Sequence, residues 1–242
     1  MKRFTTLLAA LTLVLMHDAD ARADTIASAI TTTGVDVQAH LSSNDKLVIT
    51  IMPTMDVKLN GQLGIGIATY SLAVGGYCPA IRGSLGAVST QAFVNLKLGS
   101  LALRLLEQGF APTKVLAELM EDDPQIAYRQ VGIVDASGAT AVHTGENTRP
   151  WSGHLTGDGY IVMGNVLAGE VVLQAMAAAF EAASGEDLDE RLLRTLEAGR
   201  DAGGQQTADG THLNERSAAV ITHSHRDYGH IDLRVDAHDT AV

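Results

Sequence analysis

Residues 61–99 decide the fold and read GQLGIGIATYSLAVGGYCPAIRGSLGAVSTQAFVNLKLG. The segment begins with an apolar run, Leu63–Ala68, and a short apolar run bounded by turn residues is typical of a buried strand. Closely spaced Gly and Pro residues follow, too many for one regular element. A second short strand is predicted at Ala87–Thr90, and apolar residues at helical spacing follow from Leu96. The segment therefore predicts two strands that lead into a helix.

Outside this segment the sequence predicts strands and helices in small groups. Lys46–Met52 alternates and is rich in β-branched residues, so it predicts a strand, and Asn60–Gly61 is a hairpin signal between it and the Leu63 strand. The other predictions, by residue number, are helices at 96–109, 114–120, 168–183 and 188–198, strands at 129–135, 140–144, 160–163, 217–222 and 231–235, and a loop at 151–159.

The element order is strands, two helices, strands, two helices and strands, without regular strand–helix–strand alternation. This order favours an α+β fold over a doubly wound α/β fold. Two antiparallel sheets face to face, with a helix pair on each outer face, would bury all of these elements. No linker divides the chain, so residues 24–242 are predicted to form a single domain.

The first 23 residues have the pattern of a secretory signal peptide. Lys2 and Arg3 supply positive charge, Phe4–Met16 is apolar, and Ala21-Arg22-Ala23 is a small-x-small cleavage site before Asp24. The sequence therefore predicts a periplasmic or secreted protein, with an uncleaved N-terminal anchor as the alternative. No later segment is predicted to cross a membrane.

The formal net charge of −11 argues against nucleic acid and anionic membranes as partners, because phosphate binding requires clustered Lys and Arg. The single cysteine, Cys78, excludes an intrachain disulfide. Its neighbours favour burial over the alternative role of a thiol nucleophile, for which the sequence assigns no base. An exposed helix layer or sheet edge could pair subunits into a homo-oligomer.

Several stretches, taken together, resemble one protein family. They are GQLGIGIAT, AVSTQAF, DDP, RQVGIVDASGATAVHTG, WSGH, GYIVMGNVLAG and DLRVDAH, and they extend in this order from about Gly61 to His238. The combination resembles the domain-of-unknown-function family DUF1028, which is assigned to the N-terminal-nucleophile (Ntn) hydrolase superfamily. The resemblance implies the four-layer αββα sandwich of that superfamily, two antiparallel sheets between helix pairs.

The superfamily resemblance also implies hydrolysis of an amide-type C–N bond, in a small or peptide-like substrate, without a cofactor. The nucleophile in such enzymes is an N-terminal Thr, Ser or Cys, and its own α-amine acts as the base. An α-amine is suited to this role because its ordinary pKa of about 7.7–8.0 is close to neutral pH.

Two threonines compete as the nucleophile. Thr25 follows the predicted cleavage site, but Asp24 precedes it, so a further trimming step is required. Thr50 lies where the family's first strand is expected, but the chain must be cut before it to free an α-amine. A catalytically inactive relative that binds a ligand or has a structural role is the alternative.

Three further polar residues are candidates for the same site. Asn165 ends a predicted strand beside Gly164 and is the preferred oxyanion-stabilising residue. Gln91 follows Thr90 at the end of another strand, and His154 lies in the Trp-Ser-Gly-His loop. Ordinary turn bonding is the alternative role for each.

The segment AVITHSHRDYGH suggests a different chemistry. An apolar strand that leads into His223, His225 and Asp227 resembles the metal motif of the metallo-β-lactamase fold, in which imidazoles and carboxylates bind zinc. Tyr228 stands where that motif has another His, and only a short segment follows. The chain is therefore expected to need no metal, and a zinc-dependent hydrolase is an alternative.

Overall fold

The computed structural model describes residues 49–53, 61–148, 151–224 and 228–242. The chain divides into two units, of which the first, Met1–Asp45, lies outside the described residues. Every described residue belongs to the second unit, Lys46–Val242. The predicted signal peptide and the candidates Thr25, His225 and Asp227 also lie outside the described residues, so those predictions stay open.

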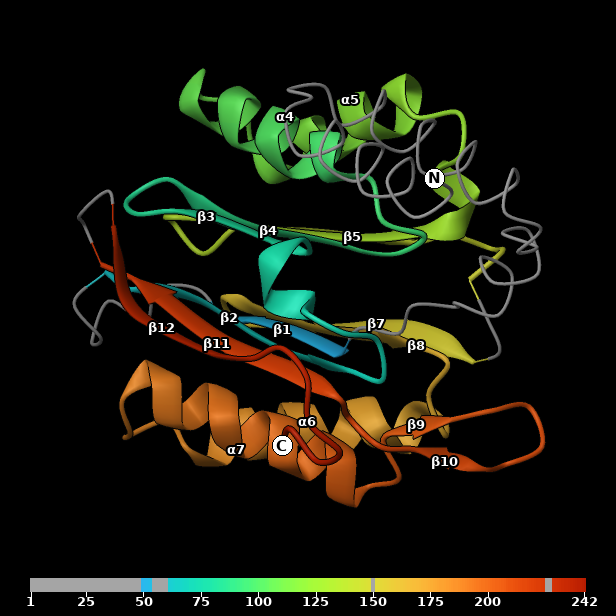
Figure 1. Cartoon of the computed structure of the whole chain (residues 1–242). Coiled ribbons are helices and arrows are strands. Elements are labelled where there is room, and N and C mark those ends of the chain that lie inside the picture. The colour runs from blue at the N-terminus through green and yellow to red at the C-terminus, as the bar shows by residue number, and fades with distance from the viewer. Residues whose placement is uncertain (1–48, 54–60, 149–150, 225–227) are drawn as a thin grey trace, which may run out of the picture. The chain divides into compact units, whose positions relative to one another are not determined.

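Six antiparallel strands form the larger sheet: β1 Ile49–Pro53, β2 Leu63–Thr69, β7 Ser152–Gly157, β8 Tyr160–Asn165, β11 Ser217–His223 and β12 Gly229–Val235. Their order across the sheet is β12–β11–β2–β1–β8–β7 (Figure 1). β1 therefore lies inside the sheet, paired with β2 on one side and with β8 on the other. The predicted antiparallel pairing of the first two strands is confirmed.

Four antiparallel strands form the smaller sheet, in the order β3–β4–β5–β6: β3 Pro79–Arg82, β4 Gly86–Ala92, β5 Arg129–Asp135 and β6 Thr140–Thr144. The bounds of β5 and β6 are those that the sequence predicts. The described residues also include a short two-stranded sheet, β9 Gln205–Gln206 and β10 His212–Leu213, and two 3₁₀ turns, Val74–Gly76 and Ile126–Tyr128.

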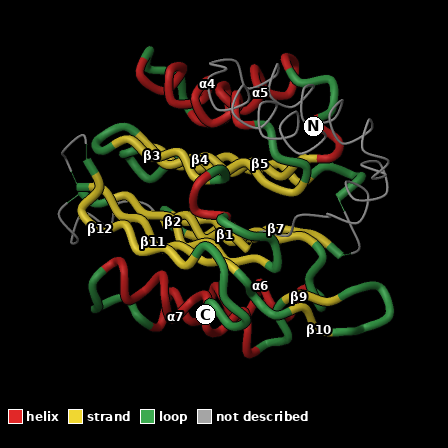
Figure 2. The backbone as a smooth tube through the Cα atoms, in the orientation of Figure 1, coloured by secondary structure: helices red, strands yellow, loops and turns green. Residues whose placement is uncertain are grey.

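Four α-helices occur among the described residues: α4 Leu96–Glu107, α5 Pro112–Asp122, α6 Glu170–Ala182 and α7 Leu188–Asp201. Helices α4 and α5 cover one face of the smaller sheet, and α6 and α7 cover one face of the larger sheet (Figures 1 and 2). The predicted α+β class is therefore confirmed. Among the described residues, no helix combines the length and the apolar character that crossing a membrane requires.

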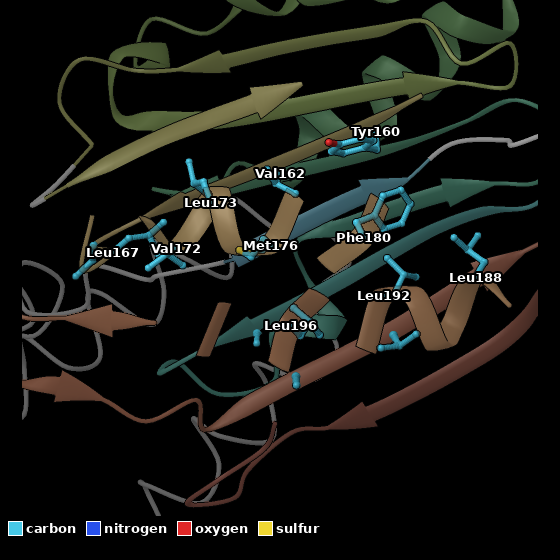
Figure 3. Close-up of a cluster of buried hydrophobic side chains, with 14 residues drawn as sticks. Tyr160, Val162, Leu167, Val172, Leu173, Met176, Phe180, Leu188, Leu192 and Leu196 are labelled. Carbon is cyan, nitrogen blue, oxygen red and sulfur yellow. The ribbon is translucent and has the colours of Figure 1, made fainter. Parts of the chain in front are cut away.

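Three apolar clusters hold these layers together. One lies between the larger sheet and α6 and α7, where Phe180, Leu192 and Leu196 are buried (Figure 3). A second lies between the two sheets, and a third lies under α4 and α5. Cys78 is 2% exposed and belongs to the cluster between the sheets, so its predicted burial is confirmed.

The glycines of β2 are explained by close packing against α7. Leu63, Ile65 and Ile67 point into the cluster between the sheets. Gly64 alternates with them, and a Cβ atom there would lie 2.9 Å from Cδ1 of Leu192. The alternation of large and small residues thus lets one strand contact the other sheet and a helix at the same time.

A buried ion pair fixes the start of β5. Arg129 pairs with Asp123 at the end of α5, and the side chains of these residues are 5% and 3% exposed. Asn95 donates a hydrogen bond to Asp123 Oδ2 at 3.1 Å, and the backbone N–H of Gln125 donates to Oδ1 at 3.0 Å. Burial acts to raise the pKa of Asp123, but the bonds from Arg129, Gln125 and Asn95 outweigh it and hold that pKa below its usual range.

Most predicted elements are shifted at their ends by one to three residues, and two differences from the sequence prediction have a clear physical cause. The segment predicted as a loop at 151–159 contains β7, an edge strand with two glycines and little apolar alternation. Helix α7 continues through Gly199 to Asp201, because Gly199 packs against Met176 of α6, where a Cβ atom would lie 2.9 Å from Cγ. The prediction that His154 lies in a loop is therefore wrong, since His154 is part of β7.

Candidate functional site

A buried cluster of three side-chain amides joins the two sheets. Gln130 of β5 lies at its centre and is fully buried. Its Oε1 accepts hydrogen bonds from Nε2 of Gln91 on β4 at 3.0 Å and from Nδ2 of Asn165 on β8 at 2.9 Å. Gln91 is also fully buried, and Asn165 is 2% exposed. The structure thus brings together Gln91 and Asn165, which the sequence analysis selects separately.

The orientation of the Gln130 amide is fixed by the larger sheet. Its Nε2 lies 3.1 Å from the backbone oxygen of Gly153 and 3.0 Å from that of Gly164. A carbonyl oxygen can only accept a hydrogen bond, so the nitrogen of the Gln130 amide must face these two glycines and its oxygen must face the other way. Gln91 and Asn165 consequently have to be donors toward Gln130.

The network continues from Gln130 to His154. Nε2 of Gln130 also lies 3.0 Å from Oγ1 of Thr144 on β6, and Thr144 Oγ1 lies 2.8 Å from Nδ1 of His154. The amide nitrogen of Gln130 cannot accept a hydrogen bond, so Thr144 Oγ1 is the acceptor in that contact. The hydroxyl hydrogen of Thr144 is then free to be donated to Nδ1 of His154. We assign the proton of the imidazole to Nε2 on this basis.

The pKa of His154 is lowered, which favours the neutral form of its ring. Burial of the ring is the first cause that lowers its pKa, and the neighbouring His143 is the second. His154 is nevertheless among the exposed residues. The network therefore extends from the fully buried Gln91 to a neutral imidazole that solvent can reach, at the edge where β6 and β7 face each other.

The two strands that carry Gln91 and Asn165 end in strained backbone. Ala92 follows Gln91 with φ 66°, and Val166 follows Asn165 with φ 57°. A left-handed conformation is unfavourable for a β-branched residue such as Val. The carbonyl of Val166 accepts a hydrogen bond of 3.0 Å from the backbone N–H of Gln206, and this bond helps to hold the turn after Asn165.

Thr50 lies close to this cluster by strand register. It pairs with Ile67 of β2 and with Met163 of β8, and both partners are buried between the two sheets. Asn165 lies two residues beyond Met163 and therefore takes the same face of β8. The backbone of β1 also lies against β4 and β5 of the opposite sheet. By register, the beginning of β1 therefore lies beside the end of β8 that carries Asn165.

Two members of the network are absent from the sequence-based candidates. Gln130 follows Arg129 at the start of a strand whose apolar residues come after it, and Thr144 ends the next strand. The signal that could have found Gln130 is its register position directly opposite Gln91 and Thr144 in the small sheet. Recognising this position requires knowledge that β4 pairs with β5, and local sequence patterns do not give that pairing.

The His-rich segment is only partly described. His223 ends β11, and its Nδ1 is buried without a hydrogen-bond partner among the described residues. Burial lowers the pKa of His223, whereas the charge of Asp232 acts in the opposite direction. No group of three His, Cys, Asp or Glu residues in the described part of the chain is arranged to hold a metal ion. A zinc site with His225 and Asp227 therefore stays an untested hypothesis.

Comparison with known proteins gives the chain a family. Residues 54–242 match the family of unknown function DUF1028. The crystal structure of protein SPO2555 from Silicibacter pomeroyi, assigned to the same family, is similar with a TM-score of 0.70 and 28% sequence identity over 79% of each chain. No curated protein matches the chain. Because the match covers well over half of its residues, the chain belongs to the DUF1028 family.

Proposed function

We propose that this protein hydrolyses an amide-type C–N bond in a small or peptide-like substrate, with Thr50 as an N-terminal nucleophile. The observation that carries the proposal is the register that places Thr50 beside Met163, next to the amide cluster around Asn165. The two sheets between helix pairs are consistent with the four-layer αββα sandwich of Ntn hydrolases, and we propose that the chain has this architecture. Thr25 is the alternative nucleophile.

The proposed chemistry begins with a cut of the chain between Ile49 and Thr50. The freed α-amine takes the proton of the Thr50 hydroxyl while the oxygen attacks the substrate carbonyl. The protonated amine then gives its proton to the leaving nitrogen, and the C–N bond breaks. Water hydrolyses the resulting ester and restores the free Thr50.

Asn165 is the proposed stabiliser of the oxyanion. One N–H of its side chain is used by Gln130, and the other forms no hydrogen bond within the described part of the chain. A buried, preorganised amide donor of this kind stabilises developing negative charge more strongly than water does. Gln130 is a positioning residue, because it fixes the Asn165 amide without a proposed contact to the substrate.

The first experiment is N-terminal sequencing with intact mass measurement on the protein exported from a bacterial host. We expect a mature chain that begins at Thr50. Incubation with a β-lactone, which acylates N-terminal threonines by ring opening, should then add the mass of the whole lactone to the Thr50 peptide. Thr50→Ser should retain the labelling, and Thr50→Ala should abolish it.

The same experiment separates the alternatives. A chain that begins at Asp24, remains uncut and is not labelled would overturn the proposal and favour a non-catalytic role. A chain that begins at Thr25 and is labelled there would transfer the nucleophile to Thr25. Zinc at one equivalent per chain, with activity lost on its removal, would favour the His223 segment. A chain exported without residues 1–23 would also support the proposed periplasmic or secreted location.

A further inference from the structure

Strand β12 is an open edge of the larger sheet. In the described part of the chain it pairs with β11 alone, and Figure 1 shows it at the outer border of the sheet. None of its seven residues is buried, and Leu233 is 63% exposed. Natural proteins usually protect such an edge, because its unpaired N–H and C=O groups are ready to bind another strand.

One face of β12 carries two opposite charges. Arg234 donates to Asp232 through Nε at 2.6 Å and through Nη2 at 2.8 Å. Their register partners on β11, Ala219 and Ile221, belong to the cluster between the two sheets. The charged pair therefore occupies the face of the strand that is turned toward the smaller sheet.

The other face of β12 is apolar. Leu233 and Val235 pair with Val220 and Ala218, which belong to the cluster under α6 and α7. Together with Leu193 of α7 and other residues they line a groove of about 350 Å³. Leu193 is 40% exposed and Val235 is 38% exposed, so this groove leaves apolar surface uncovered.

We propose that β12 pairs antiparallel with β12 of a second copy of this chain, with Leu233 opposite its own counterpart. In this register Asp232 faces the partner subunit's Arg234, and Arg234 faces the partner subunit's Asp232. The two pairs form a square of alternating charge on one face. On the other face Ile231 meets the partner subunit's Val235, so apolar side chains meet apolar side chains.

The charges select this register among its neighbours. The two strands of the dimer are related by a two-fold axis perpendicular to the sheet, which keeps each side chain on its own face. In such a pair one residue must lie opposite its own copy, so the possible registers differ only in which residue this is. Centring the pairing on Asp232 places two aspartates opposite each other. Centring it on Arg234 places two arginines opposite each other and also pairs Asp232 with Asp236. Like charges directly opposite are destabilising, so pairing through Leu233 is favoured.

Light scattering coupled to size exclusion tests the pairing on the full chain. We expect a dimer for the native protein. Asp232→Arg alone, or Arg234→Asp alone, should weaken dimerisation by about tenfold or more, because each brings like charges together. The double variant should dimerise again. An equimolar mixture of the two single variants should also form a dimer, because each then supplies the charge that the other lacks.

A cysteine at the centre of the proposed interface gives a second readout. Directly opposite residues in an antiparallel pair have Cα atoms about 4.5–5.5 Å apart, within the range that a disulfide spans. Leu233→Cys should therefore cross-link to itself under mild oxidation. Val171→Cys on α6, where the native side chain is 54% exposed, is the matched control and should not cross-link.

Three results would overturn the proposal. They are a native protein that stays monomeric at about 100 µM, a dimer that both single charge reversals leave intact, and single variants whose mixture does not recover the dimer. The last result would also exclude this register even if the chain dimerises through another surface. Failure of the Thr50 proposal would not affect any of these measurements.

Discussion

Asn165 on β8 donates a hydrogen bond of 2.9 Å from Nδ2 to Oε1 of Gln130 on β5, and this bond crosses from one sheet to the other. Most of the space between the sheets is filled by apolar side chains. A satisfied polar cluster in such surroundings is strengthened by the low local dielectric, and a partly broken one is costly. The cluster is therefore expected to fix the relative position of the sheets near the beginning of β1.

Gln130→Glu should lower the free energy of unfolding by about 3 kcal/mol or more at neutral pH. The carboxylate would face the oxygens of Gly153 and Gly164, to which the native amide donates. The urea midpoint measures the loss. Gln108→Glu is the control, because Gln108 is exposed, and it should change stability by no more than about 0.5 kcal/mol. Equal effects of the two substitutions would contradict the assigned network.

Stability should depend on pH through His154. Because its pKa is lowered on folding, the unfolded chain takes up a proton first as the pH falls below about 6.5. The stabilising contribution of the neutral ring is therefore present above that pH and is lost as the pH falls through the folded-state pKa. Urea midpoints measured at several pH values should show that the difference in stability between the native protein and His154→Gln becomes smaller at low pH.

Thr148→Val provides the control for the His154 experiment. It removes a hydroxyl that donates a hydrogen bond of 2.7 Å to the carbonyl of Gly145, but it adds or removes no titratable group. The difference in stability between this variant and the native protein should stay constant across the same pH range. If the difference in stability between His154→Gln and the native protein is also constant with pH, the pKa of His154 is not lowered on folding.

Asp123→Asn should cost about 3 kcal/mol, because Arg129 would remain buried without its counter-charge. The adjacent and exposed Asp122→Asn should cost less than about 0.5 kcal/mol. The folded-state pKa of Asp123 is lowered, so its contribution is present above about pH 4 and is lost as the pH falls through that pKa. Thermal unfolding that gives the two variants the same stability would refute the importance of this ion pair.

Gly145→Ala should lower stability by about 2–3 kcal/mol, because a Cβ atom there would lie 2.2 Å from the carbonyl oxygen of Ala127. Neither backbone segment can move freely, since the N–H of Gly145 donates to the carbonyl of Arg129 at 2.8 Å. Gly185→Ala is the matched control. A Cβ atom at position 185 would have no neighbouring atom within 4 Å, so this substitution should leave stability unchanged or raise it by up to about 1 kcal/mol. Calorimetry of both variants gives the comparison.

The parts of the fold that local patterns determine could be predicted from the sequence. The sequence predicts β5 and β6 with the bounds that the structure shows, because β5 contains an apolar run and Ser137–Gly138 marks the turn to its hairpin partner. The sequence predicts a loop where β7 lies, because an edge strand with two glycines has few of the apolar and β-branched residues that indicate a strand.

The candidate site was less accessible to sequence reasoning. Asn165 and Gln91 stand at strand ends, where polar residues are visible as interruptions of apolar runs. Gln130 stands beside Arg129 at the start of β5, where a polar residue is ordinary, and its role depends on partners 39 and 35 residues away in the chain. Thr50 was placed by resemblance, and its register beside Met163 emerged only from the pairing of β1 with β8.

The fixed direction of the amide cluster has a consequence for how such sequences can diverge. Gly153 and Gly164 accept through their backbone oxygens, so the direction of the Gln130 amide is set by acceptors that belong to no side chain. A replacement at Gln130 that puts a donor group in place of its oxygen would leave the donating amides of Gln91 and Asn165 without an acceptor. Gln91, Gln130 and Asn165 would therefore have to change together. A variant that alters only one of them would lose hydrogen bonds in the buried cluster until a second substitution restores them.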